Sequence, residues 1–371
     1  MWIDSLLTAW LFLTLGAWWP VWFRRNKPPS PHVEIPTSSS GISIIIPFRN
    51  EARRLPDLLR SIQRACTENI PVELIFVNDD STDSSPHLVE NFSAPCPHIL
   101  LHSYARGPSP KKEALWTGIR HAQYPTIITW DADIVIPPTY FHDIFQVLQN
   151  HSQAPMIIAP VGMISPEKPS WLAGFQQAEN LYLQAITRLS AMAGHPLMCN
   201  GAHLIFRKDA FLAVNGYRDL PPAAGGDDMF LMIKIKQRFP HQISYAGSAL
   251  ITVRTYPVKT WLHWWRQRLR WSRKNTLLAD MDIRMAGLWQ MLVYAGYFLA
   301  LTRPAFWWAG NLILWTAALL IIHSEAQRRN ENLPVRYQWF WLLLSPWLYT
   351  AVNLAALWPV RFRWKERTFR Q

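Results

Sequence analysis

The chain of 371 residues carries a formal net charge of +12 and is rich in tryptophan (21) and proline (29). Its length allows one large or two ordinary domains. Residues 41–255 contain 18 basic and 18 acidic residues, so the basic excess lies in the remaining segments, next to apolar runs. Basic charge beside apolar runs is typical of the cytoplasmic side of a membrane, and it argues against a nucleic-acid-binding protein.

The N-terminal segment contains an apolar run, Ile3–Phe23, followed by Arg24 and Arg25. A run of this length suffices to span a bilayer, and the positive flank favours a cytoplasmic position for the domain that follows. We therefore expect a transmembrane helix in residues 1–25, a stiff proline-rich linker in residues 26–40 and a multi-pass protein of the inner membrane.

The three cysteines, Cys66, Cys96 and Cys199, form no CxxC pair and show no metal-ligand spacing. The simplest expectation is a cytosolic catalytic domain whose thiols are reduced.

From Gly41 to residue 255 the apolar pattern alternates between strands and helices. The predicted strands are 42–47, 72–77, 99–101, 126–130 and 156–161, and the predicted helices include 111–122 and 229–239. This alternation is typical of an α/β domain with a mostly parallel sheet and helices on both faces. Neither a GxGxxG motif after the first strand nor a P-loop is present, which argues against a dinucleotide oxidoreductase and a P-loop nucleotide hydrolase.

The strand 126–130 ends in two carboxylates, Asp131 and Asp133. In open α/β sheets, ligands bind beyond the carboxyl ends of the strands. Two neighbouring carboxylates repel each other and need a cation, and a hard ion such as Mg²⁺ is commonly shared between carboxylates and substrate phosphates. The alternative is a solvated turn after a strand.

Two further acidic clusters lie at the ends of predicted elements. The run 78–83 follows the strand 72–77, and Gly225-Gly226-Asp227-Asp228 precedes the helix 229–239. Each has a structural alternative, because Ser81 and Thr82 could cap the following helix, and an aspartate is favoured at a helix N-terminus.

Tryptophan and arginine alternate in residues 257–279, which predicts a basic amphipathic helix in a membrane interface. A surface for stacking RNA bases is the rival interpretation. Three apolar segments follow, 287–301, 304–322 and 339–360, and the last residues, 361–371, form a basic tail. We therefore expect the catalytic domain in residues 41–255, the interfacial helix in 256–282 and membrane segments in 283–360. The positive tail favours a C-terminus on the cytoplasmic side. Four full membrane spans that start from an N-terminus on the outer side would instead place the C-terminus outside.

Several motifs occur in one order along the chain and are, in sequence, Pro47-Phe48-Arg49-Asn50-Glu51, Val77-Asn78-Asp79-Asp80-Ser81-Thr82-Asp83, Lys111 with Ala114-Leu115, Asp131-Ala132-Asp133, Cys199-Asn200-Gly201-Ala202, Gly226-Asp227-Asp228 and Gln267-Arg268-Leu269-Arg270-Trp271. In this order they resemble the motifs of membrane-bound family 2 glycosyltransferases with the GT-A fold. That group contains cellulose, chitin and hyaluronan synthases and ceramide glucosyltransferase. Asn78, Asp80 and Pro110 depart from the family pattern.

The resemblance implies a role for each matching residue. It implies metal binding by Asp131 and Asp133, with Mg²⁺ or Mn²⁺ as the ion, and a general base at Asp228. The implied acceptor-side residues are Cys199, Asn200, Gly201 and Asp227. The implied donor-binding residues are Pro47, Asn50, Glu51, Asp79, Lys111, Asp131, Gln267, Arg270 and Trp271.

The function that the resemblance implies is inverting transfer of a sugar from a nucleotide diphosphate sugar, expected to be a UDP-sugar. The acceptor would be a lipid or lipid-linked glycan at the cytoplasmic membrane face. A processive polysaccharide synthase is the alternative, although three C-terminal apolar segments are few for a secretion channel. A non-catalytic membrane scaffold is a second alternative, but it gives no reason for three separate aspartate clusters. Because a helix dipole lowers the pKa of a carboxylate in its first turn, we expect Asp228 to be an ionised but weak base.

Overall fold

The computed structural model describes residues 41–371 except for 68–69, 105–108, 222–224, 276, 302–303, 359–360, 365–366 and 371. The predicted N-terminal transmembrane helix in residues 1–25 and the linker in residues 26–40 lie outside the described residues.

The centre of the molecule is a seven-stranded sheet in the order β3-β2-β1-β4-β8-β6-β9. The strands are β1 (Ile42–Phe48), β2 (Val72–Asp79), β3 (His98–Ser103), β4 (Thr126–Trp130), β6 (Met156–Ile158), β8 (His203–Arg207) and β9 (Ser244–Tyr245). Strands β1 to β4 are mutually parallel, whereas β8 runs antiparallel to both β4 and β6. The predicted mostly parallel sheet is therefore confirmed, with the direction reversed at β8.

Helices cover both faces of this sheet because its strands are apolar on both sides. One face packs on α3 (Leu55–Ala65) and α6 (Tyr140–Asn150), and the other on α5 (Pro110–His121) and α9 (Asp227–Arg238). Within β1, Ile44 and Ile46 contribute to the first layer and Ile45 to the second, as the two-residue period of a strand requires. The short helices α4 (Ser85–Glu90) and α8 (Lys208–Ala213) lie at the margins.

The predicted strand 156–161 is wrong as a single element. It divides into β6 and β7 (Val161–Met163), and β7 joins β5 (Ile134–Val135) and β10 (Val253–Thr255) in a second sheet of order β5-β10-β7. Pro160 lies at the break, where a residue without a backbone N–H cannot continue the pairing. The short helix η1 (Ala249–Ile251) immediately precedes β10.

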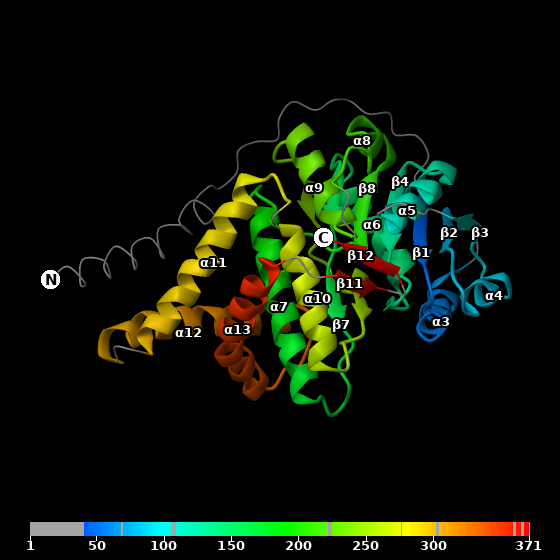
Figure 1. Cartoon of the computed structure of the whole chain (residues 1–371). Coiled ribbons are helices and arrows are strands. Elements are labelled where there is room, and N and C mark those ends of the chain that lie inside the picture. Colours follow the sequence, from blue (N-terminus) through cyan, green and yellow to red (C-terminus); the bar gives the residue numbers. More distant parts are fainter. Residues whose placement is uncertain are drawn as a thin grey trace.

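A second body of helices lies beside the α/β domain. It consists of α7 (Trp171–Met192), α10 (Trp261–Asn275), α11 (Met281–Ala300), α12 (Pro304–Arg328) and α13 (Val335–Ala356). In Figure 1, α11, α12 and α13 lie on the side opposite β1–β3, with α7 and α10 between them. Residues of α7, α10, α12 and α13 form one apolar cluster. A hairpin of β11 (Arg361–Trp364) and β12 (Arg367–Arg370) follows α13.

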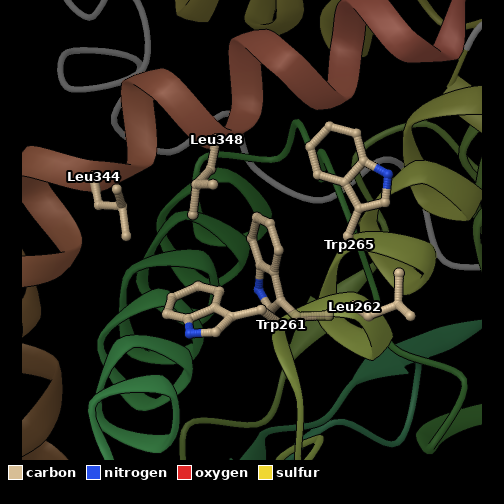
Figure 2. A pocket seen from close by; sticks show the side chains of 6 residues that line it. Trp261, Leu262, Trp265, Leu344 and Leu348 are labelled. Atoms are coloured by element: carbon tan, nitrogen blue, oxygen red, sulfur yellow. The ribbon is translucent and has the colours of Figure 1, made fainter.

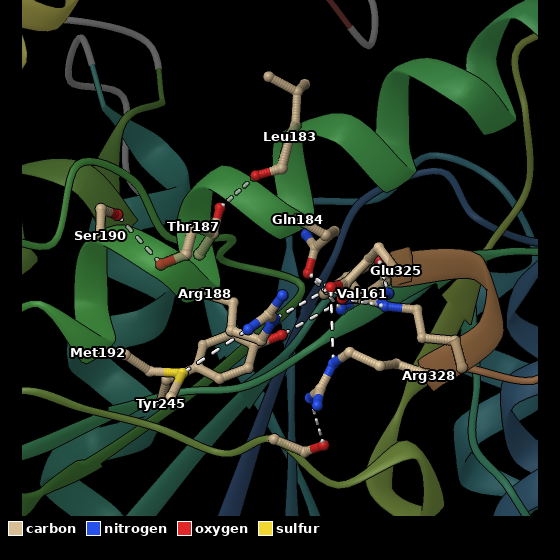
Figure 3. Close-up of polar contacts among 12 residues, drawn as sticks. Val161, Leu183, Gln184, Thr187, Arg188, Ser190, Met192, Tyr245, Glu325 and Arg328 are labelled. Atoms are coloured by element: carbon tan, nitrogen blue, oxygen red, sulfur yellow. Dashed lines mark hydrogen bonds and ion pairs between the residues drawn. The ribbon is translucent and has the colours of Figure 1, made fainter. Parts of the chain in front are cut away.

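A buried ionic cluster joins α12 to the α/β domain (Figure 3). Glu325 of α12 accepts from Arg188 of α7 at 3.0 Å and from Arg329 at 2.8 Å. Arg329 also donates to the carbonyl of Val161 at 3.3 Å and to the side chain of Gln184 at 3.0 Å. Because these groups are buried and mutually paired, the end of α12 is held in one orientation on β7 and α7.

Among the described residues, no helix combines the length and the apolar character needed to cross a membrane. The predicted segments 287–301, 304–322 and 339–360 do fall on α11, α12 and α13. Their prediction as membrane-spanning helices is not confirmed.

The expectation of reduced thiols is wrong for two of the three cysteines. Cys66 and Cys96 form a disulfide, with their Cα atoms 6.3 Å apart, whereas Cys199 is free. The pair joins the end of α3 to the connection before β3, and these two segments are neighbours only in the folded sheet.

Candidate active site

The carboxyl ends of β1, β2 and β4 meet at one edge of the sheet because these strands are parallel. Asp79 is the last residue of β2 and is buried, and Asp131 directly follows β4. Pro47 is buried within β1 beside Val77. The predicted site residues at the ends of these strands therefore share the edge at which ligands bind in such sheets.

The loops after β1 and β2 hold each other in unusual backbone conformations. Asn50 and Asp80 have positive φ angles of 50° and 52°. The Asn50 side chain accepts from the backbone N–H of Thr82 at 2.8 Å, and the Ser81 hydroxyl accepts from the N–H of Asn50 at 3.2 Å. Left-handed backbone at residues other than glycine costs free energy and is concentrated at functional sites.

Two details of these loops correct or extend the sequence analysis. Ser81 and Thr82 do not cap α4, whose N-cap residue is Ser84. The backbone N–H of Glu51 donates to the hydroxyl of Ser85 at 2.8 Å, which fixes the start of the helix that follows β1.

Lys111 joins two of the predicted carboxylate clusters. Its ammonium donates to Asp131 at 2.7 Å and lies 3.6 Å from Asp227. Burial opposes the charge on Lys111, but the neighbouring carboxylates Asp131 and Asp227 raise its pKa well above the usual value. The aspartates predicted for the donor side and for the acceptor side are therefore parts of one charged site.

The second carboxylate of the Asp-x-Asp motif has a partner that the sequence analysis missed. Arg54, just before α3, contacts Asp133 at 2.6 Å. Asp131 and Asp133 supply two hard oxygen donors, and no group of three or more His, Cys, Asp or Glu suitable for a metal exists among the described residues. This donor set fits a Mg²⁺ or Mn²⁺ ion that takes its remaining ligands from substrate phosphates.

The start of α9 places Asp228 against the acceptor-side loop. Gly226 is the N-cap residue, with a φ of 75°, so neither Asp227 nor Asp228 is the plain N-cap considered above. One carboxylate oxygen of Asp228 accepts from the N–H of Gly201 at 2.9 Å, and the other accepts from the N–H of Met229 at 2.8 Å. A substituent at Gly201 would lie 3.4 Å from Asp227 and from Asp228, so the loop approaches both aspartates closely.

The two neighbouring aspartates of α9 differ in acidity. Burial raises the pKa of Asp228, and the adjacent charge of Asp227 raises it further. Burial also opposes the charge on Asp227, but Lys111 and Lys274 lower its pKa. The expectation that the helix dipole leaves Asp228 with a low pKa is therefore wrong, because burial and the like charge outweigh the dipole.

The other acceptor-side residues lie in the loop before β8. Cys199 is half-buried, and burial together with Asp228 and Asp227 raises the pKa of its thiol. The side chain of Asn200 accepts from the N–H of Ala202 at 3.0 Å. Asn200 therefore shapes the loop that presents the Gly201 N–H to Asp228.

The three predicted donor-binding residues of the Gln-x-x-Arg-Trp motif lie on α10 and have different neighbours. Gln267 accepts from Arg268 at 2.6 Å, and Trp271 lies 4.2 Å from the Arg268 guanidinium. Arg270 instead lies in the field of Asp131, Asp227 and Asp228; burial lowers its pKa although these carboxylates oppose the shift. Of the three motif residues, Arg270 is the one that the structure brings to the carboxylates.

Arg268 owes its position to Glu179 of α7, a buried residue that the sequence analysis missed. Glu179 accepts from Arg268 through both carboxylate oxygens, from the indole N–H of Trp264 at 3.2 Å and from the hydroxyl of Tyr349. This arrangement fixes α10 between α7 and α13. The sequence gives only one indication of it, because Glu179 is the single acidic residue of α7.

The apolar hollow shown in Figure 2 is separate from this charged site. It has a volume of about 430 Å³ and is lined by Trp261, Leu262, Trp264, Trp265, Leu344 and Leu348 of α10 and α13. Trp261 and Arg270 lie on opposite faces of α10, because nine residues make about two and a half helical turns. The hollow is therefore not the site at which the charged groups converge.

Comparison with known proteins agrees with this geometry. Residues 43–212 match the glycosyl transferase family 2 model. The chain is 23% identical over 281 residues to the 4,4'-diaponeurosporenoate glycosyltransferase of Staphylococcus haemolyticus, covering 74% of this chain and 73% of the relative. It is 25% identical over 258 residues to the probable glycosyltransferase YdaM of Bacillus subtilis, covering 68% of this chain but only 59% of the relative.

The fold is similar to that of a mannosyltransferase from Pyrobaculum calidifontis, solved in complex with GDP-Man and Mn²⁺. The TM-score is 0.58 at 17% identity, with 96% of this chain and 97% of the other covered. This similarity identifies the α/β architecture as GT-A-like. The match of residues 43–212 to the glycosyl transferase family 2 model and the similar proteins identify the chain as a glycosyltransferase.

Proposed function

We propose that this glycosyltransferase moves a sugar from a nucleoside diphosphate sugar to a lipid or lipid-linked acceptor, with inversion at the anomeric carbon. The observation that carries the proposal is the convergence of Asp228, Lys111 and Asp131 at the carboxyl edge of the sheet. The relative named as a diaponeurosporenoate glycosyltransferase supports a lipid acceptor.

The reaction is a single displacement. The acceptor oxygen forms a bond to the anomeric carbon while the bond from that carbon to the diphosphate breaks, and the electron pair of that bond leaves on the diphosphate. Asp228 accepts the acceptor proton. Its pKa, raised by burial and by Asp227, makes it a stronger base than an ordinary aspartate, and such a base transfers protons more effectively near neutral pH.

The cations of the site oppose the charge that develops on the leaving diphosphate. Lys111 and Arg270 both lie in the field of Asp131, so their positive charges are concentrated where phosphate oxygens would bind. Asp131 and Asp133 would hold the divalent ion, which as a Lewis acid would neutralise phosphate charge. Asn50, in the loop after β1, and Asp79, at the end of β2, lie at the same edge and are proposed to contact the nucleoside.

We place the reaction at the cytoplasmic face of a membrane as part of the same proposal. The support is the basic excess outside residues 41–255 and the exposure of large apolar side chains on the C-terminal helices. Exposed examples on α11, α12 and α13 are Leu288, Leu292, Leu312, Ile313, Leu320, Leu343 and Leu354.

The Asp228→Asn variant tests the proposed base. It keeps the shape of the side chain and the acceptor oxygen for the Gly201 N–H but removes the base. We expect donor affinity within a few-fold of the parent protein and a transfer rate lower by on the order of a hundredfold or more. Donor affinity and transfer should be measured on one preparation, first with a panel of nucleotide sugars to identify the donor.

The matched control is Asp209→Asn, because Asp209 is an exposed aspartate paired with Arg207 away from the site. It should transfer sugar at the parental rate. If Asp228→Asn also kept the parental rate, Asp228 would not be the base and the proposed mechanism would be wrong.

A further inference from the structure

Lys274 is a cation of the site that belongs to none of the motifs discussed above. It lies on α10 four residues after Arg270, so the two side chains project from the same face of the helix. Its pKa is lowered by burial and by Arg270, while Asp228 and Asp227 act in the opposite direction. The lysine is therefore inside the charged site and not on the solvated side of α10.

The side chain of Lys274 lies along the glycine pair that leads into α9. A Cβ atom added to Gly225 would lie 3.2 Å from the Lys274 ammonium, and one added to Gly226 would lie 3.1 Å from its Cδ atom. Both glycines also have positive φ angles, 87° and 75°. The pair therefore permits the left-handed turn before Asp227 and also leaves room for the Lys274 side chain beside the start of α9.

The three cations that α5 and α10 bring to Asp131, Asp227 and Asp228 do not interact with them equally. Lys111 and Arg270 interact most strongly with Asp131, whereas Lys274 interacts most strongly with Asp228. On the donor side, two cations, Lys111 and Arg270, therefore provide the positive charge. On the acceptor side, Lys274 is the leading counter-charge of Asp228.

The other groups that face Asp228 do not replace this charge. Lys111 also lowers the pKa of Asp228, but less than Lys274 does, and its ammonium is paired with Asp131. Asp227, on the same helix, repels the Asp228 carboxylate, and Cys199 and Tyr217 are uncharged, since burial raises the pKa of both. Lys112 of α5 contributes a weaker field, and its ammonium donates to the carbonyl of Pro221 at 3.4 Å and lies over the ring of Phe230.

We propose that Lys274 is a positioning residue for the general base, and that its ammonium, laid across Gly225 and Gly226, keeps the Asp228 carboxylate charged. The proposal rests on the proposed function for the role of Asp228. It also gives α10 a second task, because the helix that carries Arg270 to the donor phosphates carries the counter-charge of the base as well.

The physical consequence is a shift in pH dependence. Burial and Asp227 already raise the pKa of Asp228, and Lys274 limits that rise. An opposite charge lowers a carboxyl pKa, by about one to three units where the two charges lie about 4–6 Å apart. Without the ammonium, the acid limb of the kcat/KM profile should move upward by about one pH unit or more, with activity recovering above the new limb.

The experiment compares Lys274→Met, Lys274→Gln and Lys274→Arg with the parent enzyme and with Lys259→Met, a control at an exposed lysine. The full chain in detergent is assayed for kcat/KM from pH 5 to 9, and donor affinity and thermal unfolding are measured in parallel. We expect both neutral variants to shift the acid limb upward, the arginine variant to restore it and the control to keep it. If Lys274→Met does not fold, the glutamine and arginine variants supply the same comparison.

Equal loss of rate at every pH, with an unmoved acid limb, would mean that Lys274 has only a structural role and would overturn the proposal. An unchanged profile in both neutral variants would also overturn it. Failure of the proposed function has a different signature, because Asp228→Asn would then retain the parental rate whatever the Lys274 variants do.

Discussion

Replacing Glu179 by glutamine would remove the counter-charge of Arg268 with little change in shape. The two side chains are almost completely buried, at 1% and 4% exposure, so solvent cannot take the place of the lost partner. The carboxylate also accepts from Trp264 and Tyr349, which are left with a weaker acceptor. Breaking one partner of a buried ion pair typically costs about 3–5 kcal/mol.

The expected change in melting temperature follows from the size of the chain. An unfolding entropy of about 2.1 cal/mol/K per residue gives roughly 0.8 kcal/mol/K for the whole protein, so Glu179→Gln should lower Tm by about 4–6 °C. Glu113→Gln, at an exposed position on α5, is the control and should change Tm by less than about 1 °C. Differential scanning calorimetry of the purified proteins measures both.

The double variant Glu179→Met, Arg268→Met separates a lost charge from lost packing. Because it removes both charges together, it should recover most of the stability that Glu179→Gln loses. An unchanged Tm in Glu179→Gln would refute the reasoning, since it would mean that Arg268 is solvated or paired elsewhere when the carboxylate is gone.

Two further predictions concern pH and metal. The buried His203 has its pKa lowered from 6.5 to about 4 by burial, so the unfolded chain binds more protons between these values and stability should fall as the pH is lowered from 6.5 to 4. Denaturant titrations should show this loss, which should be about 3 kcal/mol smaller in His203→Gln; equal loss in both proteins would contradict the assignment. Asp133→Asn should weaken Mn²⁺ binding by tenfold or more in the presence of a nucleoside diphosphate, and electron paramagnetic resonance should detect it, with unaltered binding as the contrary result.

The elements nearest to the site could largely be predicted from the sequence. The strand Thr126–Trp130 is found with the predicted bounds, and β2 extends the predicted strand by two residues to include Asp79. Both are short runs of mostly apolar and β-branched residues with carboxylates at or directly after their ends, so the hydrophobic pattern and the end of each strand could be recognised together. The division between β6 and β7 was not predicted: Pro160 is a local sign that strand pairing stops, but it does not show that the chain then joins a second sheet.

The environment of the predicted site residues could not be predicted from the sequence. Asp228 was chosen from its motif, but the direction of its pKa shift depends on how deeply Gly201 and α10 bury it. Lys274 was missed although it follows Arg270 at the helical spacing of four, since that spacing does not say which face meets the aspartates. The pairing of Cys66 with Cys96 likewise depends on tertiary proximity.

The reversal of strand direction at β8 has a consequence for how such a protein can diverge. Asn50, Asp79, Lys111 and Asp131 all precede the reversal, whereas Gly201 directly precedes β8 and Asp228 follows it. Most of the proposed donor groups are therefore consecutive in the gene and precede the proposed acceptor groups, whereas Arg270 on α10 follows both. The two sets meet along the pairing of β4 with β8, whose hydrogen bonds come from backbone atoms and tolerate many side chains. A crossover between homologous genes in the stretch that encodes the connection between these strands would exchange the acceptor residues together with Arg270, while Asn50, Asp79, Lys111 and Asp131 are inherited together.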